Sequence, residues 1–157
     1  MTGSDFRHTM KALNDFGKFI ITNYKSQLEA EKMNNGELYR NIKYSVSTGT
    51  GGWVISVSLA DYWKYIEYGR RPGKMPPLEV IEKWIDVKEI KPHSMTLKSG
   101  KTVIPKPSKL PFLIARSIGR RGIQPKPLFQ KSFEVAKQQF MQVIEDAIIQ
   151  DIKENLI

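Results

Sequence analysis

The stretch that decides the fold is Lys43–Leu59, which reads KYSVSTGTGGWVISVSL. Every second residue of Trp53–Leu59 is large and apolar, and the same alternation with serines precedes it; this period of two is typical of strands with one covered face. The glycine-rich Thr48–Gly52 between the two runs predicts an antiparallel hairpin with strands at 43–48 and 53–59. Because these glycines join strands and do not open a helix, a turn is favoured over a phosphate-binding loop.

A long helix is expected on each side of the hairpin. Residues 5–32 carry apolar side chains at steps of three, four and seven, and Ser4 is a plausible N-cap. Residues 128–155 show a second amphipathic pattern, with Glu and Gln on much of the opposite face. We therefore predict an α+β fold, in which long N- and C-terminal helices pack on a small antiparallel sheet.

The middle of the chain differs in composition from both ends. All nine prolines lie in Pro72–Pro127, which predicts a Pro-rich basic insertion at about 72–127 within a single domain spanning residues 1–157. Within the insertion we expect a helix from Pro76-Pro77 to about Ile90, a hairpin over 95–103, and a helix over 109–118 closed by Gly119. Arg120, Arg121 and Gly122 are expected to begin an extended linker.

The charge is concentrated in one segment of this insertion. The 157 residues carry a net charge of +9, yet residues 91–131 contain ten Lys or Arg and no Asp or Glu. Such a segment is expected to face nucleic acid, an acidic protein or an anionic membrane surface. The residues expected to contact DNA or an acidic partner are Lys98, Lys101, Lys106, Lys109, Arg116, Arg120, Arg121 and Lys126.

Asp61–Lys74 is the most unusual stretch, with four aromatic residues in Tyr62–Tyr68 followed by glycines, a proline and basic residues. It predicts either a short helical turn whose aromatic rings cap the sheet or a surface anchor, since Tyr, Trp and Arg dominate interface hot spots; the two readings are compatible. A Walker-type phosphate loop is absent, because only three residues separate Gly69 from Gly73 and Met75 follows Lys74.

Several function classes are disfavoured by the residues that are missing. There is no cysteine, and His8 and His93 are the only histidines, so thiolate zinc sites and cysteine catalysis are excluded. Glu79, Glu82 and Asp86 fall on a predicted helix in the pattern of a solvated face, so neither a metal site nor a cofactor is expected. The sequence contains no run of 18 apolar residues, so no membrane span is predicted. The N-terminus lacks the apolar region of a secretory signal.

Four segments, in this order, give the chain a likeness to a known family. Residues 36–42 (GELYRNI) resemble a Thr-Gly-x-Leu-Arg-x-Ser-Ile turn, and Trp53–Leu59 resembles the strand that follows it. Residues 62–69 (YWKYIEYG) resemble a Tyr-Ala-x-Tyr-Val-Glu-Phe-Gly segment, and residues 125–133 (PKPLFQKSF) resemble an Arg-Pro-Phe-Leu-x-Pro-Ala entry into a last helix. The chain thus resembles the tail-completion family of tailed bacteriophages, also described as head–tail joining, neck or minor tail-component proteins.

The resemblance covers about residues 10–145 and implies a structural role. Members of the family form rings at the junction between capsid and tail, so the chain is expected to be a virion protein without enzymatic activity, made in the host cytoplasm. The expected partners are copies of the chain, the neighbouring portal or adaptor and tail proteins, and packaged DNA in non-specific contact. The residues expected at the subunit interface are Tyr62, Trp63, Tyr65, Glu67, Tyr68, Arg70, Arg71 and Phe129.

Two alternatives remain open at this point. A small basic nucleic-acid-binding module would use Arg70, Arg71, Arg120 and Arg121 on phosphates and aromatic rings for stacking. A small toxin-like enzyme is disfavoured because the sequence offers no acid–base set.

Overall fold

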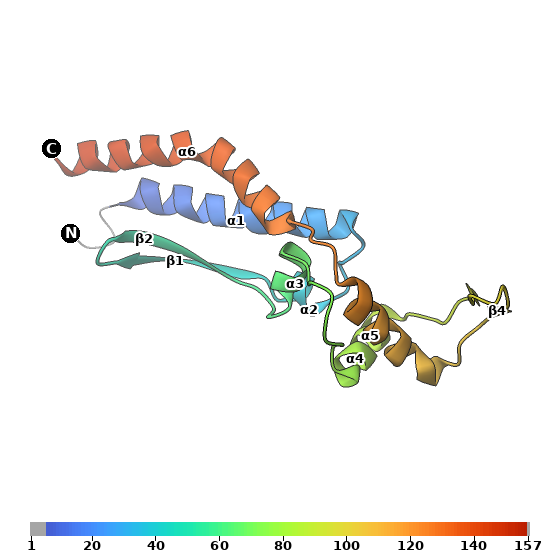
Figure 1. The fold of residues 1–157 in the computed structure, drawn as a ribbon. Coiled ribbons are helices and arrows are strands. Elements are labelled where there is room, and N and C mark those ends of the chain that lie inside the picture. The colour runs from blue at the N-terminus through green and yellow to red at the C-terminus, as the bar shows by residue number, and fades with distance from the viewer. Residues whose placement is uncertain (1–5, 157) are drawn as a thin grey trace. The chain divides into compact units, whose positions relative to one another are not determined.

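A computed structural model describes residues 6–156 of the chain, and its elements are shown in Figure 1. The fold is α+β, with a long helix at each end, a small two-stranded antiparallel sheet, and an inserted segment of helices and a hairpin, as the sequence predicts. The chain divides into two compact units. Unit 1 contains the chain up to Trp63 and again from Pro127 onward, and unit 2 contains Lys64–Lys126.

Unit 1 is built on two helices that run along one another, α1 (Arg7–Ala30) and α6 (Leu128–Asn155) (Figure 1). Both helices were predicted, and the structure shortens the first by two residues at each end. The predicted cap Ser4 lies outside the described residues, and Phe6 occupies the N-cap position of α1 without a side-chain cap. The buried side of α1 follows the expected spacing and consists of Thr9, Ala12, Leu13, Phe16, Gly17, Ile20, Tyr24 and Leu28.

The hairpin consists of β1 (Lys43–Gly49) and β2 (Gly52–Ser58), paired from Lys43↔Ser58 to Gly49↔Gly52. The strands extend further into the glycine run than predicted, because only Thr50 and Gly51 form the turn. The hairpin packs on α1, and α2 (Glu37–Arg40) connects them. At the contact, a Cβ on Gly17 would lie 2.5 Å from Cδ2 of Tyr44, so the strand approaches the helix at a position where only glycine fits.

The core of unit 1 lies between the two helices and the sheet. Phe16, Ile20 and Ala136 are buried at its centre. The ring of Phe16 lies edge-on to Phe140 and Phe133, with centroids 5.9 and 6.1 Å apart. Such edge-to-face pairs add about 0.5–1.5 kcal/mol to the free energy gained from burial alone. The partly buried side chains around this centre are Phe19, Ile55, Phe129, Phe140 and Ile144.

Unit 2 holds most of α3 (Trp63–Glu67), followed by two longer helices and a hairpin. The helices are α4 (Leu78–Lys88) and α5 (Leu110–Arg121), which pack on each other. Between them lie β3 (Met95–Thr96), β4 (Thr102–Val103) and the 3₁₀ turn η2 (Pro107–Lys109). The predicted helix and hairpin over 76–103 are confirmed, although α4 ends at Lys88, two residues before the expected Ile90.

The predicted end of the second inserted helix was wrong. Helix α5 continues through Gly119 and stops at Gly122, whose φ of 73° lies in the left-handed region, so Arg120 and Arg121 are helical and not part of a linker. Gly119 is instead buried in the helix, where a Cβ would lie 2.9 Å from Cγ of Met75 and 3.2 Å from the Gly73 carbonyl oxygen. Gly119 therefore permits close packing inside the helix and does not end it.

Candidate interaction surfaces

The aromatic segment around α3 contains both buried and exposed rings. The Tyr62 hydroxyl accepts a 2.7 Å hydrogen bond from the Leu38 N–H, and burial raises the pKa of Tyr62 although this hydrogen bond opposes the shift. The Trp63 ring lies edge-on to Phe129, with centroids 6.0 Å apart. Tyr65 and Tyr68 keep 53% and 70% of their surface exposed. The segment forms the expected short helical turn, but the contacts of Tyr62 and Trp63 are with α2 and α6 and not with the sheet. Tyr65 and Tyr68 are exposed, and the surface anchor stays a prediction.

Besides Trp63, three of the expected interface residues have structural positions. Glu67 is 3% exposed, and Phe129 is half-buried beside the core of unit 1. The Arg70 backbone pairs with Ile123 in both directions at 2.8 and 2.9 Å, and its guanidinium donates to the Lys74 carbonyl at 2.7 Å. By contrast, Arg71 is exposed. The surface that can meet another molecule is thus reduced to Tyr65, Tyr68 and Arg71, with part of Tyr62.

Two segments of unit 2 that are distant in the sequence lie against each other at glycines, and this contact was not predicted from the sequence. Residues 66–73 run alongside 119–126, with backbone hydrogen bonds from Lys126 to Ile66 and from Gly73 to Gly119, each 2.7 Å long. A Cβ on Gly122 would lie 2.1 Å from the Arg70 carbonyl oxygen. Gly69, one of the two glycines compared with a Walker-type loop, has the same role, since a Cβ there would collide with the Ile123 carbonyl oxygen.

The net positive charge of the chain comes from unit 2. It contains fifteen Lys or Arg against five Asp or Glu, a net charge of +10, whereas the residues of unit 1 sum to −1. All eight residues expected to contact DNA or an acidic partner lie in unit 2, and all except the half-buried Lys126 are exposed. They occupy the β3–β4 loop, the approach to α5, α5 itself and the segment after it, as Lys98, Lys101, Lys106, Lys109, Arg116, Arg120, Arg121 and Lys126.

Two helices expose apolar stripes that nothing in their own unit covers. On α4 the stripe is Val80, Trp84 and Val87, at i, i+4 and i+7, with 57%, 44% and 50% of each residue exposed. Ile81 is the buried residue of this helix. At the end of α6, Ile149, Ile152 and Leu156 form a second stripe at the same kind of spacing. Exposed apolar patches are a common feature of surfaces that contact other molecules.

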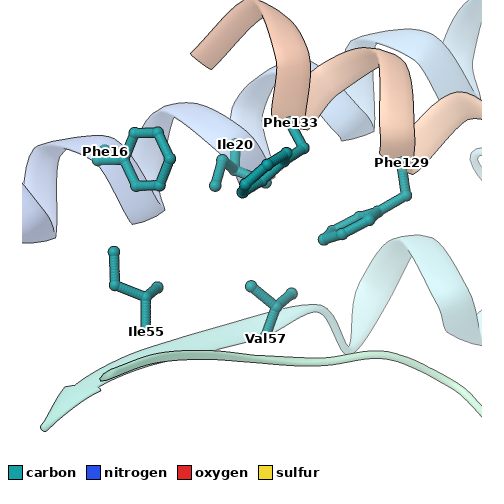
Figure 2. A pocket seen from close by; sticks show the side chains of 6 residues that line it. All are labelled: Phe16, Ile20, Ile55, Val57, Phe129 and Phe133. Atoms are coloured by element: carbon teal, nitrogen blue, oxygen red, sulfur yellow. The ribbon is translucent and has the colours of Figure 1, made fainter. Parts of the chain in front are cut away.

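A pocket of about 290 Å³ opens between the sheet and the helices of unit 1 (Figure 2). Ile55 and Val57 approach it from β2, and four side chains of α1 and α6 face them across the gap. All six lining side chains are apolar: Phe16, Ile20, Ile55, Val57, Phe129 and Phe133. It offers no charged or polar side chain to orient a substrate, so it suits an apolar side chain better than a polar ligand.

Within the described residues, one group of side chains could hold a metal ion: His8, Asp151 and Glu154, whose ligand atoms lie within 4.8 Å of one another. The oxygens of Asp151 accept backbone hydrogen bonds from His8 and Thr9, and Glu154 pairs with Arg7 at 3.0 Å and with His8 at 3.2 Å. These contacts join the start of α1 to the end of α6. The sequence analysis did not identify Asp151 as a residue that joins the two helices. Its helical spacing from Phe140, Ile144 and Ala147 does place this acid on the apolar face of the helix.

Comparisons with known proteins give no relative: no family model, no curated protein and no solved structure matches the chain. Over residues 6–156, no helix combines the length and apolar character that crossing a membrane requires.

Proposed function

We propose that the chain is a structural subunit of the head–tail junction of a tailed bacteriophage, a neck or tail-completion protein that assembles into a ring between the portal or adaptor and the tail. The observation that carries the proposal is the exposed apolar and aromatic surface. Tyr65, Tyr68, the α4 stripe and the α6 stripe all remain uncovered. A chain of this size gains by covering such surface with copies of itself and neighbouring proteins.

The resemblance of the four segments to the tail-completion family supports the place of assembly. The last two segments lie in and after α3 and at the entry to α6, where Trp63 and Phe129 pack together. The contact brings the two segments together in this chain, although Trp63 stands where the family segment has alanine. The fold expected from the resemblance, two long helices on a small sheet, is also the fold of the chain.

The proposal is tested by removing the chain from the phage that encodes it. DNA-filled heads and free tails that fail to join are the expected products, and restoring the chain should restore complete particles. Complete particles formed without the chain would contradict the proposal.

A second function, binding of nucleic acid, is favoured by one observation, the +10 charge of unit 2. In the ring, the same charge would line a DNA passage or face an acidic neighbour. A dedicated nucleic-acid binder would instead place aromatic rings among the cations. The exposed rings of unit 2 are Tyr65, Tyr68, Trp84 and Phe112, and of these only Phe112 lies within residues 91–131, where the cations are most concentrated. We therefore favour the structural role.

A further inference from the structure

The outer edge of β2 has backbone groups that no other strand of the described residues pairs with. A two-residue turn closes on a hydrogen-bonded pair, here Gly49↔Gly52, and such pairs then alternate along the hairpin. The backbone groups of Trp53, Ile55 and Val57 therefore point away from β1, and in the described part of the chain no strand pairs with them. Natural edge strands are usually protected by charges, proline or bulges, and β2 (GWVISVS) has no charged residue and no proline.

The apolar pocket lies on the side of the sheet that faces the helices. The side chains of Ile55 and Val57 form its floor in Figure 2, with Phe129 and Phe133 on the opposite side. A strand added to β2 would direct alternate side chains toward this space. Since apolar cavities of about 150 Å³ accommodate benzene, a pocket of about 290 Å³ has room for a branched aliphatic side chain.

Unit 2 contains a strand with the matching properties. The β3–β4 hairpin is held by only two residue pairs, Met95↔Val103 and Thr96↔Thr102, and so small a hairpin gains from further pairing. The Leu97 N–H donates to the Lys101 carbonyl at 2.9 Å, which fixes the alternation and turns the backbone groups of Thr102 to the free edge. Two residues on, Ile104 continues the same alternation and keeps 69% of its surface exposed.

We propose that Thr102–Ile104 of one copy pairs antiparallel with β2 of a second copy, placing Ile104 opposite Ile55 and its side chain in the pocket. The charges do not oppose this pairing, because the donating unit carries +10 and the accepting unit is nearly neutral at −1. Each copy has one donor and one acceptor, so the contact is head-to-tail and closes into a ring when the rotation allows. The inference rests on the proposed function only in that copies of the chain assemble with one another.

Disulfide trapping tests the contact directly, since the chain has no cysteine of its own. The variants Ile104→Cys and Ile55→Cys are mixed in concentrated solution and oxidised. The mixture should give a disulfide-linked dimer in much higher yield than either variant alone. The proposal is wrong if the mixture gives no more dimer than the single variants. It is also wrong if a disulfide forms only when both cysteines are placed in the same chain and links them within that chain.

A pair of matched substitutions gives an independent reading. Ile104→Asp should weaken self-association, measured by sedimentation, by roughly tenfold or more, as expected for a buried anchor. Leu97→Asp is the control, because Leu97 is also exposed but its side chain lies on the other face of the hairpin. Equal weakening by both variants, or none by Ile104→Asp, would overturn the assignment.

The trapping experiment also separates this inference from the proposed function. When purified particles contain the chain at the head–tail junction and the Ile104–Ile55 bond does not form in them, the inference fails and the function stands. When the bond forms in solution and particles assemble normally without the chain, the function fails and the contact stands.

Discussion

The carboxylate of Asp151 caps helix α1 from the far end of the chain. It accepts hydrogen bonds from the backbone N–H groups of His8, at 3.1 Å, and Thr9, at 2.7 Å. These are two of the unpaired donors at the start of the helix, and Phe6 at the N-cap position gives them no side-chain partner. A residue of α6 thus caps α1, a role that Ser, Thr or Asp at the N-cap position normally has. It also joins the end of α6 to the start of α1.

Replacing Asp151 with alanine should lower the free energy of unfolding by about 1–2 kcal/mol, the usual cost of losing an N-cap. Asp151 is 1% exposed, so its two N–H partners lose their acceptor without full compensation by water. Urea unfolding followed by circular dichroism measures the change. Asp146→Ala is the control, since Asp146 is an exposed acid on the same helix that accepts only a surface hydrogen bond from Gln142. Similar losses in both variants would refute the capping role.

The same cap predicts a dependence of stability on pH. Burial would raise the pKa of Asp151, but the hydrogen bonds from Thr9 and His8 outweigh it and hold the pKa below its ordinary value of 3.8. A carboxyl whose pKa is depressed by folding contributes stability above its unfolded pKa and loses it as the pH falls through the folded pKa. The wild-type protein should therefore lose stability below about pH 4.

The variant Asp151→Asn provides the comparison for that titration, because its side chain cannot ionise. The difference in stability between wild type and variant should persist down to about pH 5 and shrink below about pH 4. A difference that stays constant down to pH 2 would show that the charge of Asp151 does not contribute.

The contact between Gly17 and Tyr44 predicts the sign of a helix substitution. Glycine to alanine in a helix normally gains about 1 kcal/mol. Here the added Cβ would meet the Tyr44 ring at 2.5 Å, and overpacking costs about 1–3 kcal/mol, so Gly17→Ala should be destabilising. In a double-mutant cycle of thermal unfolding, Tyr44→Ser should remove most of that penalty. If Gly17→Ala stabilises the chain, or if the two effects simply add, the close packing of β1 on α1 is contradicted.

The exposed cations of unit 2 and the exposed tyrosines should act separately. The double variant with Arg120→Ala and Arg121→Ala should weaken low-salt DNA retention equally for all sequences and reduce its salt slope by about 2, because each phosphate contact contributes about 0.9. Tyr65→Ala and Tyr68→Ala should leave DNA retention unchanged and impair particle assembly. Salt titrations of DNA binding and counts of complete particles measure the two effects. Tight, salt-resistant binding that requires the tyrosines would favour the nucleic-acid binder.

The sequence predicted the elements whose signal is local. The period of two in Trp53–Leu59 and the helical spacings around it reflect which side chains face a core, and both were confirmed. Gly119 was misassigned because a glycine required by a neighbouring backbone cannot be told, by spacing, from one that ends a helix. Asp151 was missed for a related reason, since its partners lie more than 140 residues away.

The candidate sites divide in the same way. The concentration of charge could be read from composition, and the structure places all eight cations in one unit. Exposure could not be predicted: Glu67 and Phe129 were both expected at an interface, yet Glu67 is buried and Phe129 is half-buried beside the core of unit 1. The exposure of the α4 stripe could not be predicted either, because the periodicity of a short helix with apolar residues on two faces does not say which face α5 covers.

The central claim, a ring subunit at the head–tail junction, is tested most directly by a reconstruction of the intact particle with a density label fused to the chain. The account predicts several labelled copies arranged in a closed ring around the tail axis, next to the portal. A single copy, copies away from that axis, or a particle without the chain would contradict it.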